Sequence, residues 1–221
     1  MEAKITMHSF IALLKPIISE FRSRATISWS KRRLRIVFEK ISGYDFSSTI
    51  SQKKLGFLPN EINLCSPSDE RILREIFKNI NIKNSDRILD IGCGKGFALN
   101  YFLTLPFSKV SGLEISELLA SICKHNLNRK WGQKAEVILS DATQYDGYSK
   151  FNYFYLYNPF PSREILEKVI EKIVSQSTKE IFVIYNNALN TEVLFEKGFI
   201  IKKRILDPTS TGKDILIFSK Y

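Results

Sequence analysis

The chain has 221 residues, 44% apolar and 25% charged, a balance typical of a globular protein with a substantial core. Three widely spaced cysteines and two histidines argue against a zinc site or a disulfide framework. No apolar run approaches the ~18 residues of a membrane span, so we expect a cytoplasmic protein with neither an export signal nor a transmembrane anchor.

Positive charge is concentrated in the first part of the chain. The formal net charge is +10, and residues 1–60 carry 11 Lys/Arg against 4 Asp/Glu, which accounts for +7 of it. Apolar residues at helical spacing predict a helix from Met7 to Phe21, and basic residues crowd positions 22–35. They form either a surface for an anionic partner, such as nucleic acid or acidic lipid, or a solvated helical face.

A polar stretch separates this extension from the rest of the chain. Gly43 to Pro59 predicts a loop or linker, so we divide the chain into a basic helical extension, 1–60, and a second domain, 61–221. The second domain is expected to begin with a helix that continues to Ile80, capped by Ser66 or Ser68.

A glycine turn then follows a strand. Arg87–Gly96 reads RILDIGCGKG, and the apolar run before its glycines predicts a buried strand, with a helix over 97–103. Glycines permit backbone angles closed to other residues and let a ligand lie on the main chain at a helix N-terminus. Phe97 stands where a dinucleotide fingerprint needs glycine, and P-loop spacing is absent. Asp90 would repel a pyrophosphate but suits a cationic ligand.

Strands and helices alternate through the remainder, which predicts an α/β fold. The strands are expected at 109–115, 135–139, 151–157, 180–185, 199–206 and 214–219, with helices at 116–129, 164–175 and 189–197.

Polar side chains follow the ends of three of these strands. Glu114 falls 24 residues after Asp90, where its carboxylate can accept hydrogen bonds from ribose hydroxyls. Asp141 follows the third strand and Asn158 the fourth, at the edge where open α/β sheets bind ligands. A helix cap or surface position for Glu114, and ordinary turns at Asp141 and Asn158, are the alternatives.

Together these features resemble the class I S-adenosylmethionine (SAM)-dependent methyltransferases. The likeness rests on D-x-G-x-G-x-G at 90–96, with Glu114, Asp141 and Asn158 in order, and it covers residues 66–221. It implies a Rossmann-like class I methyltransferase sheet of seven strands, the last antiparallel, and an N-terminal helical extension. It also implies SAM as the cofactor, no metal, and cofactor contacts from Asp90, Gly92, Cys93, Gly94, Gly96, Glu114, Ile115, Asp141, Ala142 and Asn158.

The sequence Asn158-Pro159-Phe160 resembles the [D/N]-P-P-[F/Y/W] motif of methyltransferases that act on adenine, cytosine or glutamine amino groups. In those enzymes the Asn or Asp and a backbone carbonyl accept hydrogen bonds from the target NH₂. The resemblance implies a catalytic role for Asn158 and substrate contacts for Pro159 and Phe160. Pro161 follows Phe160, a departure from the motif, and Asn versions also occur in non-SET lysine methyltransferases and poorly characterised bacterial relatives.

We therefore expect SAM-dependent methyl transfer to an amine or another N or O nucleophile. Catalysis would consist mainly of positioning and desolvation. The acceptor stays open among protein, RNA, glycan and lipid metabolite. The alternative is a non-catalytic SAM-fold module whose basic extension docks RNA, a membrane or a protein partner.

Overall fold

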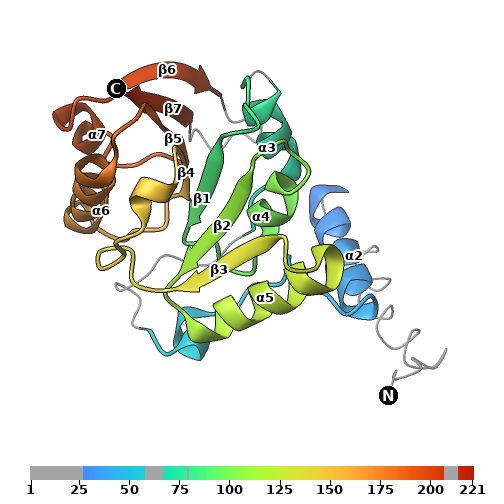
Figure 1. Ribbon diagram of the computed structural model, residues 1–221. Coiled ribbons are helices and arrows are strands. Elements are labelled where there is room, and N and C mark those ends of the chain that lie inside the picture. Colours follow the sequence, from blue (N-terminus) through green and yellow to red (C-terminus); the bar gives the residue numbers. More distant parts are fainter. Residues whose placement is uncertain (1–26, 58–66, 79, 207–213) are drawn as a thin grey trace, which may run out of the picture. The chain divides into compact units, whose positions relative to one another are not determined.

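The computed structural model describes residues 27–57, 67–78, 80–206 and 214–221 (Figure 1). The chain forms two compact units, Met1–Ser48 and Thr49–Tyr221. The helix predicted over 7–21 lies outside the described residues. The division predicted at residue 60 stays a prediction.

The first unit contains one described helix, α2 (Ile27–Ile41). The carboxylate of Glu39 accepts hydrogen bonds from the backbone N–H and the hydroxyl of Ser47, at 2.8 and 2.5 Å, which folds the following chain back on the helix. Phe46 is buried, and its ring stacks on Tyr44. The basic residues of the extension thus lie partly on this helix.

A single sheet of seven strands organises the second unit. Its order is β3-β2-β1-β4-β5-β7-β6. The first five strands pair in parallel, and β7 lies antiparallel between β5 and β6. The predicted seven-stranded sheet with its antiparallel last strand is confirmed. The strands are β1 (Arg87–Ile91), β2 (Lys109–Glu114), β3 (Ala135–Leu139), β4 (Tyr153–Tyr157), β5 (Ile181–Asn186), β6 (Ile200–Ile205) and β7 (Ile215–Lys220).

Helices cover both faces of this sheet. Figure 1 shows α3, α4 and α5 on one face and α6 and α7 on the other. Their bounds are α3 (Glu70–Phe77), α4 (Phe97–Phe102), α5 (Glu117–Trp131), α6 (Arg163–Gln176) and α7 (Glu192–Glu196), with 3₁₀ turns η1 (Gln52–Leu55) and η2 (Tyr148–Lys150). Within the described ranges, every helix is too short or too polar to cross a bilayer.

The start of α3 corrects one prediction. Its N-cap is Asp69, whose carboxylate accepts from the backbone N–H of Arg71 at 2.8 Å. Ser68 is buried and bonds elsewhere, and Ser66 lies outside the described residues. The helix also ends at Phe77 and does not reach Ile80.

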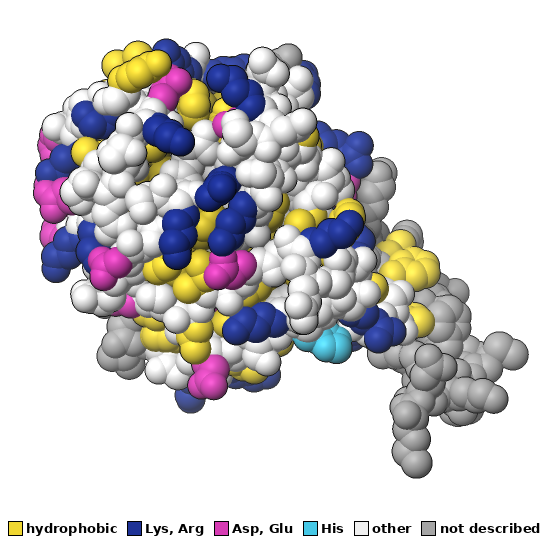
Figure 2. All heavy atoms as spheres, viewed as in Figure 1, with side chains coloured by type: hydrophobic (Ala, Val, Ile, Leu, Met, Phe, Trp, Pro, Cys, Tyr) yellow, Lys and Arg dark blue, Asp and Glu magenta, His cyan; other side chains and the backbone are white. Residues whose placement is uncertain are grey.

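Many basic side chains of the second unit pair with carboxylates. Figure 2 shows Lys and Arg side chains spread over one face of the molecule, with acidic side chains among them. Lys109 pairs with Glu136 at 2.7 Å, and Lys197 pairs with Glu171 at 2.6 Å. These exposed pairs are worth little individually, but they neutralise much of the local charge.

Candidate functional site

The predicted site residues gather at the carboxyl edge of the parallel strands. Ile91, the last residue of β1, lies level with Leu113 in β2 and with Leu156 in β4, while Glu114 pairs with Leu139 at the end of β3. The direction of the strand order reverses between β1 and β4. Open α/β sheets bind ligands at such a reversal.

The glycine turn after β1 is tied to the end of β2. The backbone N–H groups of Gly92 and Cys93 both donate to the Leu113 carbonyl, at 2.8 and 3.1 Å, and the N–H of Gly96 donates to the Cys93 carbonyl at 2.9 Å. Gly92, Gly94 and Gly96 have positive φ, the left-handed region that favours glycine. These three N–H groups therefore bond within the protein and are not available to a phosphate.

Glu114 links the glycine turn to the start of α5. One carboxylate oxygen accepts from the N–H of Gly94 at 2.8 Å, and the other accepts from the N–H of Ser116 at 2.9 Å. Burial raises the pKa of Glu114, and these N–H bonds partly oppose that rise. Each oxygen has a second lone pair, so the carboxylate can still accept a hydroxyl hydrogen bond from a ligand.

Asp90 is a buried acid. The residue is 3% exposed, and among the described residues none forms an ion pair or hydrogen bond with its carboxylate. Burial, and secondarily the negative charge of Glu114, raise its pKa well above the usual range. A cationic ligand would relieve this cost. The site therefore fits the sulfonium and ammonium groups of SAM better than a phosphate.

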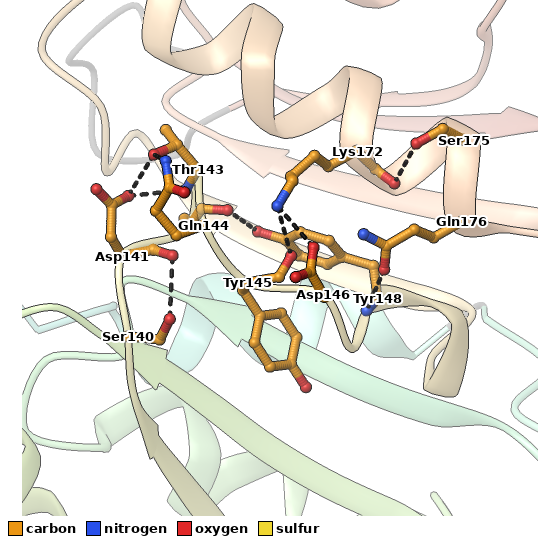
Figure 3. A network of polar contacts seen from close by, with 11 residues as sticks. Ser140, Asp141, Thr143, Gln144, Tyr145, Asp146, Tyr148, Lys172, Ser175 and Gln176 are labelled. Carbon is orange, nitrogen blue, oxygen red and sulfur yellow. Dashed lines mark hydrogen bonds and ion pairs between the residues drawn. The ribbon is translucent and has the colours of Figure 1, made fainter.

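The loop after β3 carries Asp141 and Ala142 and is fixed by hydrogen bonds (Figure 3). The exposed Asp141 carboxylate accepts from the N–H and hydroxyl of Thr143, at 2.7 and 2.9 Å. The Tyr148 hydroxyl donates to the Ala142 carbonyl at 2.7 Å, and the Tyr148 N–H donates to Gln176 at the end of α6 at 3.0 Å. Asp141 is thus presented on a braced loop.

Large apolar side chains lie exposed beside these acids. Ile115 is 43% exposed, Leu118 48% and Leu139 49%, all next to the ends of β2 and β3. Apolar walls with a few polar groups are typical of ligand sites. Ile115 was among the predicted contacts; Leu118 and Leu139 were not, because exposure cannot be read from an apolar strand or helix pattern.

Asn158 directly follows β4 and contacts the next strand. It has φ 41°, an uncommon value outside glycine. The Tyr185 hydroxyl donates to its Oδ1 at 3.4 Å, and burial raises the pKa of Tyr185 to about 12, so that hydroxyl stays protonated at neutral pH. Sequence reasoning missed Tyr185, which looks like an ordinary core residue of β5.

Pro159 packs directly on the glycine turn. A Cβ built on Gly92 would lie 2.7 Å from the Pro159 Cβ. The turn after β1 and the loop after β4 are therefore in contact, although Gly92 and Pro159 are 67 positions apart in the sequence. Phe160 is half-buried and packs against the main core cluster.

A buried polar chain lies nearby and was also missed. Asn186 donates to the Tyr155 hydroxyl at 3.0 Å, and that hydroxyl shares a 3.1 Å hydrogen bond with Ser68. These hydrogen bonds join the segment before α3 to the middle of β4 and the end of β5. A polar residue ending the apolar β5 run was its one signal.

Part of the chain is similar to known proteins. The model of the family described as ribosomal RNA adenine dimethylase matches residues 68–201, more than half of the chain. A relative from Limosilactobacillus reuteri, "rRNA adenine N-6-methyltransferase", is 27% identical over 146 residues, covering 66% of this chain and 52% of the relative. A protein of the same description from Escherichia coli is 27% identical over 141 residues, covering 63% of this chain and 51% of that protein. The chain thus spans about half the length of the curated relatives it matches.

The fold is shared with solved methyltransferases. An RNA methyltransferase from Salinibacter ruber, determined in complex with S-adenosyl-L-homocysteine, superposes with a TM-score of 0.54 at 15% identity, covering 69% of this chain and 91% of that one. At this identity the likeness concerns the fold alone.

Proposed function

Because the chain belongs to the ribosomal RNA adenine dimethylase family, we propose that it transfers methyl groups from SAM to the N6 amino group of adenine in RNA. The predicted class I SAM-dependent methyltransferase, with SAM as its cofactor, is confirmed by that membership. The adenine acceptor goes further than the sequence prediction, which left the acceptor open. It is supported by the descriptions of the two curated relatives.

The observation that carries the proposal is the contact between the glycine turn and the loop after β4. Pro159 lies against Gly92, which brings Asn158 beside the turn that follows Asp90. An acceptor held by Asn158 would therefore lie next to a cofactor held by that turn. Short separation and fixed orientation are the main sources of rate in a displacement of this kind.

The chain's own residues supply binding and orientation. SAM, when bound, supplies a methyl group activated by its sulfonium. We assign Asp90 to its cationic part and Glu114 to its ribose hydroxyls. The Asn158 side-chain oxygen and the Tyr157 carbonyl would accept hydrogen bonds from the adenine NH₂, with Phe160 beside the base. Asn158 is an orienting group, because an amide is no base at neutral pH.

Cofactor binding is tested by titration calorimetry of the purified chain with SAM. Asp90→Ala and Glu114→Ala are each expected to weaken SAM binding by at least tenfold, about 1.4 kcal/mol, because each loses a charge-assisted contact. Glu136→Ala, an exposed carboxylate paired with Lys109, is the control and should bind as wild type. Undiminished affinity in both site variants would refute the assignment.

Methyl transfer is tested with methyl-labelled SAM and adenine-containing RNA, followed by digestion and identification of the labelled nucleoside. Wild type should yield N6-methylated adenosine. Asn158→Ala and Asn158→Gly should both lose most of the transfer while SAM affinity stays near wild type. The glycine variant removes backbone strain as an explanation, and Asn190→Ala, at a second positive-φ asparagine, should leave transfer intact. SAM binding with no label on adenine would reject this proposal and favour a non-catalytic module.

A further inference from the structure

The far end of α5 carries positive charge without acidic neighbours in sequence. Between Glu117 and Glu136 the chain has four Lys/Arg and no Asp/Glu. All four side chains are exposed. We call them the α5 basic surface: Lys124, Arg129, Lys130 and Lys134. Basic residues in a last helical turn complement the helix dipole, which explains Arg129 and Lys130 but neither Lys124 nor Lys134.

The three lysines of this surface differ from other basic residues of the unit. Within the described residues, no carboxylate forms an ion pair with Lys124, Lys130 or Lys134. In contrast, Lys109 and Lys197 are each neutralised by an acidic partner. The uncompensated charge therefore persists at the protein surface, where it attracts polyanions.

Trp131 makes cation–π contacts with two of the lysines. Its indole N–H donates to Asn100 in α4 at 2.9 Å, which fixes the ring at the end of α5. The ammonium groups of Lys130 and Lys134 lie 5.6 and 6.0 Å from the ring centroid, within cation–π range. Holding both ammonium groups on one ring reduces the conformational entropy they would lose on binding a ligand.

We propose that the α5 basic surface binds the phosphate backbone of the RNA substrate at a distance from the methylated base. This inference rests on the proposed function. The first turn of α5 follows Glu114 at the candidate site, and 15 residues of helix extend about 22 Å from it. Phosphate contacts at that distance fix the register of an RNA without reading its sequence. In this proposal the loop after β4, and not the α5 basic surface, selects the base that is methylated.

The test is RNA binding by the full chain as a function of salt. A fluorescently labelled, adenine-containing RNA hairpin is titrated between 50 and 200 mM salt. The triple variant Lys124→Ala/Lys130→Ala/Lys134→Ala should reduce the slope of log K against log [salt] by about 2–3 and weaken binding roughly 10- to 100-fold. SAM affinity and the unfolding midpoint should remain those of wild type.

The matched control replaces three exposed lysines elsewhere, Lys168→Ala/Lys179→Ala/Lys202→Ala. An equal loss in this control would show a net-charge effect and overturn the inference. So would an unchanged salt slope in the α5 variant, or binding by wild type to phosphatidylserine vesicles but not to RNA. Methylation is scored separately. If the α5 triple variant methylates adenine with the wild-type KM for RNA, the role of the α5 basic surface is overturned and the proposed function stands. If RNA binding depends on the α5 basic surface but no methyl group is transferred, the proposed function is rejected and the role of the surface stands.

Discussion

Alanine in place of Gly96 measures how tightly the glycine turn packs on α5. Gly96 has φ 84° and ψ 23°, and an added Cβ would lie 2.6 Å from the sulfur of Cys123, with the next atom, in Leu127, at 3.4 Å. The left-handed conformation costs an alanine about 1–2 kcal/mol. Forcing the methyl against the buried sulfur adds about 1–3 kcal/mol. The variant should therefore lose about 2–5 kcal/mol of unfolding free energy.

Gly56 separates the two contributions. Its backbone is nearly the same, φ 81° and ψ 12°, but an added Cβ would meet no atom within 4 Å. Gly56→Ala should therefore lose only the conformational part, about 1–2 kcal/mol. Both variants are compared with wild type by urea unfolding followed by circular dichroism.

A second change, Cys123→Ala, tests the clash itself. Alone it deletes one buried heavy atom and should cost about 1 kcal/mol. Combined with Gly96→Ala, it makes room for the new methyl. The loss of unfolding free energy in the double variant should therefore be about 1–3 kcal/mol smaller than the sum of the two single losses. Strict additivity, or equal losses for Gly96→Ala and Gly56→Ala, would refute the reasoning.

Three further predictions concern the site. Tyr185→Phe removes the hydrogen bond to Asn158, worth about 0.5–1.5 kcal/mol, so kcat for RNA methylation should fall about 2- to 13-fold; a comparable loss of SAM affinity would contradict this. Tyr155→Phe leaves Asn186 without its acceptor and should lower the free energy of unfolding, measured in urea, by about 1–3 kcal/mol; unchanged stability would contradict this. Because the pKa of Asp90 is raised on folding, the folded apoprotein binds more protons and loses stability as pH rises from about 4 through that pKa. Asp90→Asn should remove that decline, stabilise the apoprotein at pH 7 and weaken SAM binding; a decline as steep as wild type would contradict the assignment.

The order of elements was predictable because glycines and hydrophobic periodicity mark it. The strand expected at 135–139 coincides with β3, and the loop glycines mark the end of β1. Placement of Glu114 and Asn158 near Asp90 followed from one rule, that parallel strands end at a common edge. Such inferences need only local pattern and general topology.

The errors and omissions came from contacts between distant segments. Ser68 is a good helix-capping residue by type, but its hydroxyl bonds to Tyr155, 87 positions away, and Asp69 caps α3 instead. The partnership of Tyr185 with Asn158 spans 27 positions. No local propensity encodes these pairs, since a tyrosine in a buried strand looks the same with or without a hydroxyl partner.

The packing of Pro159 on Gly92 has a thermodynamic consequence. With no space between the two loops, a ligand that shifts either one must do work on the other. If occupancy by the methyl donor changes the affinity for the acceptor by some factor, linkage requires that the acceptor change donor affinity by the same factor. Neither dissociation constant of this protein is complete without stating whether the other ligand is present.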